Sequence, residues 1–339
     1  MRKYKIVNNG GDLRERKEEM RKVAAIIVTI TLSVMCLIGC TGGNQPGDDG
    51  NLRIGIIQFA PHPSLDNCRE GFIEGLKALG FTDDNVVFDY QNANADMNLA
   101  NTIAQKMVAD KCDLIVGIAT PAAQAAFNAT EETDIPVVFI AVSDPVGAGL
   151  SGHENVTGVS DVLQVHEQIA LVKALIPDAK TVGVIYNTGE VNSVKQVAML
   201  EEAAVSEGFS FETATVTGVS DVNLALESLL TKIDVLINVL DNTVVSAMAT
   251  IADKCSERGI AIIGSEEEQV HNGALASSGF DYFDVGAQSA GLAARMFNNE
   301  RNIPFELVKE TQVVINETVA AALNVTIPTE IADSASFVN

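Results

Sequence analysis

Polar and acidic side chains recur in this sequence directly after short apolar runs. Thr120 follows one run, Ser143 and Asp144 follow the next, and Asp241 and Asn242 follow a third. Hydroxyl and amide groups donate hydrogen bonds to carboxylates, whereas Asp and Glu accept them from ammonium groups. These residue types are suited to binding a small solute that carries both charges.

The segment Thr120, Pro121, Ala122 is expected to begin a helix, with Thr120 as its N-cap and Pro121 in the first helical position. The N–H groups of that first turn would form an anion site for a ligand carboxylate. The alternative is a helix start that faces water. For Ser143 and Asp144, the alternative to a ligand site is an Asx turn set by Asp before Pro145.

The second half of the chain has similar loops. Asn187 follows one apolar run, and Asp241 precedes Asn242 and Thr243, either of which is a candidate helix cap. The run Glu266 to Glu268 offers a carboxylate to an ammonium group. Its alternative interpretation is a solvated first helical turn, where acids are favoured by the helix dipole.

Aromatic residues are concentrated at Phe280, Asp281, Tyr282 and Phe283, although aromatics make up only 5% of the chain and Trp is absent. With Phe59 facing them, they would give an aromatic wall beside an acid, which suits an amino acid with a flat side chain. The alternative is that the same aromatic residues pack in the core.

The sequence contains no complete motif for catalysis or cofactor binding. Gly147, Gly149 and Gly152 have dinucleotide-binding spacing, but no helix pattern follows them. The sequence has no phosphate-binding loop with a Gly-Lys-Ser/Thr end and no nucleophile elbow, and its four histidines are isolated. We therefore expect no catalytic residues, no metal and no cofactor.

The formal net charge of −23 would repel phosphate backbones, which argues against nucleic acid as a partner. Cys68, Cys112 and Cys255 are far apart and lack the spacing of a zinc site. We expect Cys68 and Cys112 to be buried free thiols, because helical patterns place small apolar residues at those positions.

The N-terminus has the pattern of an export signal. Val23 to Ile38 is uncharged, follows Arg21 and Lys22, and is too short for a typical bilayer span. It ends in a sequence that resembles the bacterial lipobox, in which Cys40 would be lipidated. Residues 1–39 are thus a predicted signal peptide, with Met20 as a possible true start, and residues 40–51 are a predicted flexible tether. The alternative to a signal peptide is a short membrane anchor that is not cleaved. Both interpretations place the rest of the chain outside the cytoplasm.

Apolar strand-like runs alternate with helical patterns from residue 53 onward, which predicts α/β architecture with parallel sheets. A second βα series begins after a Gly- and Pro-rich segment, residues 144–157, which we interpret as the first crossover. The prediction is two Rossmann-like lobes with a cleft between them and multiple crossovers. Lobe 1 would comprise residues 52–156 plus 280–308, and lobe 2 residues 157–279 plus 309–339.

From about Arg53 to Asn324 the chain resembles the substrate-binding proteins of the TrpX-type ABC transporter family, which have the type I periplasmic-binding fold and are associated with aromatic amino acids. The resemblance implies an extracytoplasmic lipoprotein that captures such a ligand for a membrane permease, and we expect a monomer. The stretches that carry it are Gly55–Phe59 with His62 and Pro63, Asp89–Ala93 followed by Asp96–Asn98, Ile118–Gln124, Asp144–Gly149, Asn155–Asp161, Asp241–Ser246 and Asn272–Ala276.

The resemblance also implies roles for the candidate residues. Thr120 to Ala122 and Ser143 would hold the ligand carboxylate, and Asp281 with Tyr282 would lie at the hinge. From the other lobe, the site would be closed by Asn187, Asp241, Asn242 and the segment Glu266 to Glu268. The matching stretch of the first strand adds Gln58 and Phe59 to the candidate ligand-binding residues.

The chain departs from the family's pattern at Phe280–Phe283 and at Ile140–Val142, both of which touch the expected pocket wall. These departures bear on which side chain the ligand carries. Two other functions remain as alternatives to import: sensing, in which a membrane receptor recognises the closed lobes, and an enzyme that uses the cleft carboxylates.

Overall fold

The computed structural model describes residues 50–308 and 311–339. The predicted signal peptide, the lipidation site Cys40 and all but the last two residues of the tether lie outside the described residues. Residues 51–339 form one compact unit. Within the described residues, no helix combines the length and the apolar character that a membrane span requires.

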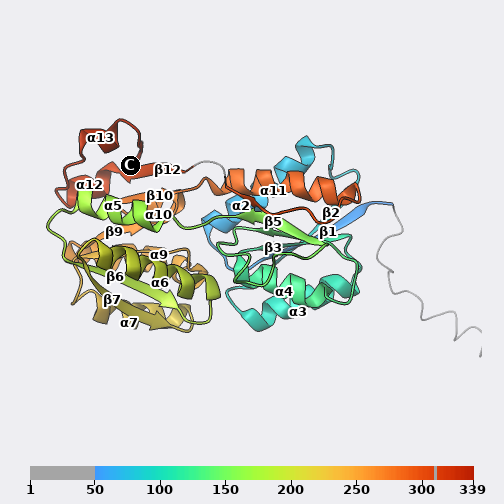
Figure 1. Ribbon diagram of the computed structural model, residues 1–339, viewed down its shortest axis with the longest axis horizontal. Helices are drawn as coiled ribbons and strands as arrows, with labels where there is room; N and C mark the ends of the chain where they lie inside the picture. Colours follow the sequence, from blue (N-terminus) through green and yellow to red (C-terminus); the bar gives the residue numbers. More distant parts are fainter. Residues whose placement is uncertain (1–49, 309–310) are drawn as a thin grey trace, which may run out of the picture. The chain divides into compact units, whose positions relative to one another are not determined.

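The first lobe is built on a six-stranded parallel sheet with helices on both faces (Figure 1). Every residue of its central strand β3 is buried, as expected for a parallel sheet covered on both faces. In spatial order the strands are β11 (Glu306–Leu307), β5 (Val156–Ser160), β4 (Val137–Ile140), β3 (Leu114–Ile118), β1 (Leu52–Gln58) and β2 (Val86–Asn92). The helices are α2 (Pro63–Ala78), α3 (Met97–Ala109), α4 (Thr120–Thr130) and α11 (Tyr282–Phe297).

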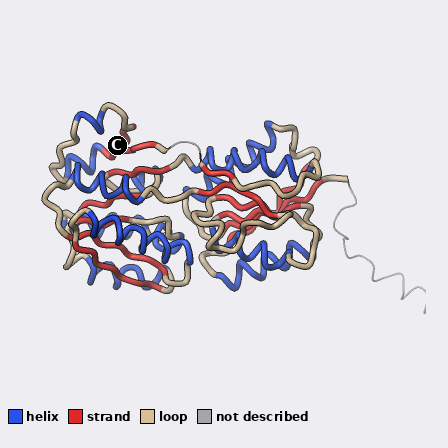
Figure 2. The backbone as a smooth tube through the Cα atoms, in the orientation of Figure 1, coloured by secondary structure: helices blue, strands red, loops and turns tan. Residues whose placement is uncertain are grey.

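The second lobe has a seven-stranded sheet, again between layers of helices (Figure 2). All its neighbouring strands pair in parallel except β10 and β12. Its strands are β13 (Ser336–Val338), β12 (Gln312–Asn316), β10 (Ala276–Gly279), β9 (Ala261–Gly264), β8 (Val235–Ile237), β6 (Thr181–Asn187) and β7 (Ser210–Val216). Its helices are α5 (Val165–Leu175), α6 (Val191–Ser206), η1 (Val219–Asp221), α7 (Val222–Leu229), α8 (Asn242–Val245), α9 (Met248–Arg258), α10 (Glu267–His271), α12 (Glu317–Ala322) and α13 (Thr329–Ala332).

The predicted pair of α/β lobes with parallel sheets is confirmed, but the first crossover lies later than predicted. Residues 156–160 pair with β4 as strand β5, so the chain leaves the first lobe only after Ser160. This strand was not predicted because it is short and contains Gly158. That glycine is required by packing, since a Cβ there would lie 2.1 Å from the carbonyl oxygen of Phe139. The chain returns between β10 and α11, and crosses again between β11 and β12.

Two helices far apart in the sequence, α2 and α11, lie side by side on one face of the first sheet (Figure 1). Glycines allow their backbones to touch. A Cβ on Gly286 of α11 would lie 2.1 Å from the carbonyl oxygen of Cys68, and a Cβ on Gly71 of α2 would lie 1.9 Å from that of Phe283. This contact fixes the start of both helices, where the chain passes the interlobe cleft.

Substitution of Gly286 by Ala should therefore separate α2 from α11 and lower the free energy of unfolding by about 1–3 kcal/mol, the usual cost of overpacking. The matched control is Gly291→Ala in the same helix, where a Cβ meets nothing within 4 Å. That change should stabilise the protein by about 0.5–1 kcal/mol, because Ala is the better helix former. Urea unfolding measures both, and equal effects of the two substitutions would contradict the packing argument.

Candidate ligand-binding site

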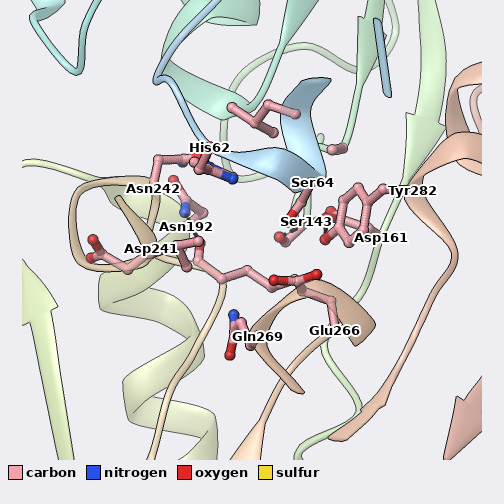
Figure 3. A pocket seen from close by; sticks show the side chains of 14 residues that line it. His62, Ser64, Ser143, Asp161, Asn192, Asp241, Asn242, Glu266, Gln269 and Tyr282 are labelled. Atoms are coloured by element: carbon pink, nitrogen blue, oxygen red, sulfur yellow. Dashed lines mark hydrogen bonds between the residues drawn. The ribbon is translucent and has the colours of Figure 1, made fainter. Parts of the chain in front are cut away.

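A pocket with about 350 Å³ of empty space lies between the lobes, where loops at the carboxyl ends of strands from both sheets meet (Figure 3). The position follows the rule that open α/β sheets bind ligands at the carboxyl ends of their strands. The lining residues are His62, Ser64, Leu65, Ala141, Ser143, Asp161, Asn192, Leu240, Asp241, Asn242, Val245, Glu266, Gln269 and Tyr282.

Asp161 lies in the first crossover and is 1% exposed. Its carboxylate accepts hydrogen bonds from the Ser143 hydroxyl at 3.1 Å and from the Tyr282 hydroxyl at 2.6 Å. Burial raises its pKa to about 6, against the opposing effect of the two hydroxyl donors. At neutral pH the group is therefore mainly a buried anion, and within residues 50–308 and 311–339 no Lys, Arg or His forms an ion pair with it.

Glu266 is the N-cap of α10, where one carboxyl oxygen accepts a hydrogen bond from the Glu268 N–H at 2.8 Å. Its other oxygen, Oε1, is buried without a hydrogen-bond partner among the described residues. Burial raises the pKa of Glu266 to about 8. At pH 7 the carboxyl group is therefore mostly protonated, which lets it donate a hydrogen bond to a ligand oxygen.

Asp241 is the N-cap of α8 and accepts hydrogen bonds from the N–H groups of Asn187 at 2.6 Å and Val244 at 2.8 Å. Burial, followed by the negative charge of the neighbouring Glu190, raises the pKa of Asp241 to about 7. Asp241 and Asn242 therefore form one rigid wall of the pocket, because the backbone that carries them is held by these bonds.

The pocket gathers buried polar atoms that have no partner. Nine such side-chain atoms occur among the described residues, and five of them belong to residues that line this one pocket. An unpaired buried polar atom costs about 1–3 kcal/mol, so such atoms are rare away from binding sites. The five are His62 Nδ1, Ser64 Oγ, Asn192 Oδ1, Glu266 Oε1 and Gln269 Nε2.

Five of the candidate residues named from the sequence line this pocket together: Ser143, Asp241, Asn242, Glu266 and Tyr282. They come from both lobes, and they lie either in loops that follow strands or at the first position of a helix. Of the run of three acids, only Glu266 is fully buried; Glu267 and Glu268 form the first turn of α10, as the alternative interpretation had it.

Thr120, Pro121 and Ala122 are not among the lining residues. They are buried in the first turn of α4, and the predicted N-cap was wrong. Ala119 occupies that position with φ 76° and without a side-chain hydrogen bond, so Thr120 is already helical and Pro121 is the second helical residue. The helix therefore begins one residue earlier, and the turn after β3 is one residue shorter, than the Thr-Pro pattern suggested.

Gln58 and Phe59, both candidate ligand-binding residues, do not line this pocket and serve the structure of the first lobe. The Gln58 amide donates to the Ala60 carbonyl oxygen at 2.9 Å and its oxygen accepts from the Tyr90 hydroxyl at 3.2 Å. Phe59, which was expected to face the ligand, packs in the core of the first lobe, and so does Phe280. The core-packing alternative holds for these two aromatic residues, whereas Tyr282 contributes both to the core and to the pocket.

Asp144, Asn187 and Asp281 have other partners. Asp144 pairs with Lys195 of the second lobe at 2.5 Å and lies in the expected turn. Asn187 donates from its amide to Thr243 at 2.8 Å within the second lobe. Asp281 is exposed and caps α11 through the Phe283 N–H at 2.8 Å, and none of the three lines the pocket.

Sequence reasoning missed Ser64, Asn192 and Gln269, and it quoted His62 and Asp161 only as parts of matching stretches. Asp161 directly follows β5, so recognition of that strand would have drawn attention to it by the strand-end rule. Asn192 and Gln269 lie in helices, and no local pattern distinguishes them from surface residues.

No group of three His, Cys, Asp or Glu side chains within residues 50–308 and 311–339 is placed to hold a metal ion. Cys68 and Cys112 are buried free thiols, as predicted, and so is Cys255. The site in this part of the chain therefore offers a ligand hydrogen bonds, charge and apolar contact.

Comparison with known proteins identifies the family. Residues 53–339 match the family described as ABC transporter substrate binding protein. The chain belongs to this family. A tyrosine-binding protein of Clostridioides difficile (strain R20291) is 41% identical over 321 residues, which are 90% of this chain and 92% of that protein. Distant solved binding proteins, at 14 to 16% identity, share its fold, the type I periplasmic-binding fold.

Two solved relatives bear on the arrangement of the lobes. The ABC domain in complex with L-Trp from Streptococcus pneumonia is 34% identical, covers 85% of this chain and 100% of its own, and superimposes with TM-score 0.81. The ligand-free, open structure of an adhesive substrate-binding protein from Clostridium difficile is more similar in sequence, at 41%, but its TM-score is only 0.63, over 85% of this chain and 99% of its own. The lobes of this substrate-binding protein are thus arranged more like those of the L-Trp complex.

Four side-chain hydrogen bonds between the lobes agree with a closed arrangement. Two of them flank the pocket, from Gln196 to the Ser143 hydroxyl at 2.8 Å and between His62 and Asn242 at 3.4 Å. The other two are Asn67 to Glu268 at 2.8 Å and Lys195 to Asp144 at 2.5 Å.

The raised pKa of Glu266 has a measurable effect on stability. Because the folded protein holds this proton more tightly than the unfolded chain, the contribution is complete below about pH 4.5 and is lost as the pH rises through about 8. Between about pH 5 and pH 9, ligand-free wild type should lose a few kcal/mol of unfolding free energy that the E266Q variant retains. The exposed Glu201→Gln change in α6 is the control. Urea unfolding across this pH series would refute the argument if E266Q followed the wild-type curve.

Proposed function

We propose that this protein captures an aromatic amino acid between its two lobes, delivers it to the ABC permease in the membrane, and catalyses no reaction itself. The observation that carries the proposal is the buried Asp161 carboxylate, which accepts two hydroxyl hydrogen bonds and has no positive partner in the part of the chain that the structure describes. A buried anion of this kind is costly unless a cation pairs with it. The α-ammonium group of an amino acid supplies that charge.

The remaining lining fits the rest of such a ligand. Donors for its carboxylate are the Ser64 hydroxyl, the Gln269 amide and the protonated Glu266, all of which have an unpaired buried atom. The apolar part of the lining, which would contact the ligand's side chain, consists of Leu65, Ala141, Leu240 and Val245. The ligands of the two relatives, tyrosine and L-Trp, support the aromatic class.

Capture would be a hinge motion between the lobes. An empty closed pocket leaves Asp161 without a cation and five polar atoms without partners, whereas the ligand satisfies them only when both lobes contact it. The ligand therefore shifts the equilibrium toward the closed form. The acids of the second lobe support a binding role and not a catalytic one, because Asp241 has both oxygens in helix-capping and backbone bonds.

The removal of charge at Asp161 tests the binding site directly. D161N should weaken L-tyrosine and L-tryptophan binding by about 10- to 100-fold, because a hydrogen bond to a charged group contributes about 1.5–3 kcal/mol. D281N, at an exposed acid outside the pocket, should bind like wild type. Isothermal titration calorimetry measures both, and an unchanged dissociation constant for D161N would refute the assignment.

We also propose that Cys40 carries the lipid that anchors this extracytoplasmic protein, on the strength of the uncharged run and the lipobox-like ending that precede it. In a host that performs lipoprotein processing, wild type should incorporate a clickable palmitate analogue and fractionate with membranes. Cys40→Ala should do neither, while Cys36→Ala, within the predicted signal, should behave as wild type. Labelling of the Cys40 variant would rule out this anchor.

A further inference from the structure

We infer that His62 makes the pocket select ligands whose side chain carries a hydrogen-bond donor, because a relay from Glu190 through Asn242 fixes Nδ1 of the imidazole as an acceptor. The inference deepens the proposed function and rests on it. It specifies the ligand class as aromatic amino acids with a phenol O–H or an indole N–H, to the disadvantage of phenylalanine.

The relay begins at Glu190, which is 2% exposed and does not line the pocket. Its carboxylate accepts four hydrogen bonds from the start of α8. They come from the Asn242 N–H at 3.1 Å and side-chain amide at 2.7 Å, and from the Thr243 N–H at 2.9 Å and hydroxyl at 2.8 Å. All four atoms that face Glu190 are donors, so its oxygens serve only as acceptors.

This arrangement determines which way the Asn242 amide points. Its NH₂ group is bound to Glu190, so its oxygen Oδ1 must face the opposite direction. There it lies 3.4 Å from Nε2 of His62, which belongs to the other lobe. An amide oxygen can only accept, so the hydrogen of this contact sits on Nε2.

The imidazole is uncharged at neutral pH, because burial lowers the pKa of His62 to about 4. A neutral imidazole carries one hydrogen, and with that hydrogen on Nε2 the other nitrogen has a free lone pair. Nδ1 is buried and has no partner among the described residues, and His62 makes no capping bond to α2. His62 Nδ1 is therefore a fixed acceptor that is available to a ligand donor.

The position of His62 indicates which ligand group reaches it. Figure 3 shows His62 and Asn242 together on one side of the pocket, and Tyr282 and Asp161 on the other. With the ammonium group at Asp161, the side chain extends toward His62. Sites built to bond a ligand hydroxyl discriminate strongly against the analogue without it, since their own polar atom is then left buried and unpaired.

The test compares L-tyrosine with L-phenylalanine, which differ only by the hydroxyl group, on the full chain purified in detergent and freed of ligand. Wild type should prefer L-tyrosine by about 10-fold or more in calorimetry. H62Q places an amide where Nε2 was and has no acceptor at Nδ1, so the preference should fall to about twofold or less. H62N keeps an oxygen near the Nδ1 position and should retain the preference, with weaker binding of both ligands.

E190Q tests the relay itself. A glutamine cannot accept all four bonds, so the Asn242 amide should turn and the preference should fall without any change at His62. His166→Gln, at an exposed histidine of α5, is the matched control and should bind as wild type. In the wild-type protein, nitrogen-15 NMR of the His62 ring should show hydrogen on Nε2 alone, and a change in the Nδ1 signal with L-tyrosine but not with L-phenylalanine. That readout does not depend on any variant folding.

The outcomes separate the inference from the function on which it rests. If wild type binds no aromatic amino acid, the proposed function fails. If wild type binds both amino acids equally, or if H62Q keeps the preference, the function stands and the inference is overturned. An equal loss of both ligands in H62Q would also overturn it, because His62 would then contact a group that the two ligands share. A hydrogen found on Nδ1 would refute the relay.

Discussion

The structure depends on one buried charge, the carboxylate of Asp161. Ser143 reaches it from the end of β4, and Tyr282 from the second crossover, so the two crossovers and the first sheet meet at this group. Because Ser143 also accepts a hydrogen bond from Gln196 of the second lobe, the same carboxylate is linked to the interlobe contact. A buried anion is stable only when it is compensated, which ties closure of the lobes to the presence of a cationic group.

The fold could be predicted from the sequence where its pattern is strong. The strands of the first sheet are apolar runs because both faces of a parallel sheet are covered, and helices such as α2 show their buried stripe at Cys68, Phe72 and Leu76. The strand β5 was not predicted because its pattern is weak: it is short, it includes Gly158, and its buried Thr157 and Ser160 carry polar groups. Its recognition requires the partner strand β4, which local sequence does not reveal.

The site could be predicted only in part, for a related reason. The strand-end rule found Ser143, Asp241 and Glu266, because these residues lie in the short segments that follow β4, β8 and β9. Asn192 and Gln269 reach the pocket from helices of the second lobe, so their role depends on how the two lobes face each other. Thr120 is a residue type that favours the N-cap position, but Ala119 occupies that position with a positive φ. The helix therefore begins one residue earlier, and no local signal in the sequence marks that conformation.

What distinguishes binding acids from structural ones is which groups already bond their carboxylate oxygens. Asp281 is occupied as a helix cap and Asp144 by Lys195 and its own turn. Asp241 lines the pocket, but each of its oxygens already accepts a backbone hydrogen bond. Glu266 caps with one oxygen and leaves the other buried and unpaired, whereas Asp161 accepts hydrogen bonds from the hydroxyl groups of two pocket residues. Residue type and loop position identify all these acids alike; only the hydrogen bonds of the folded chain show which of them remain available to a ligand.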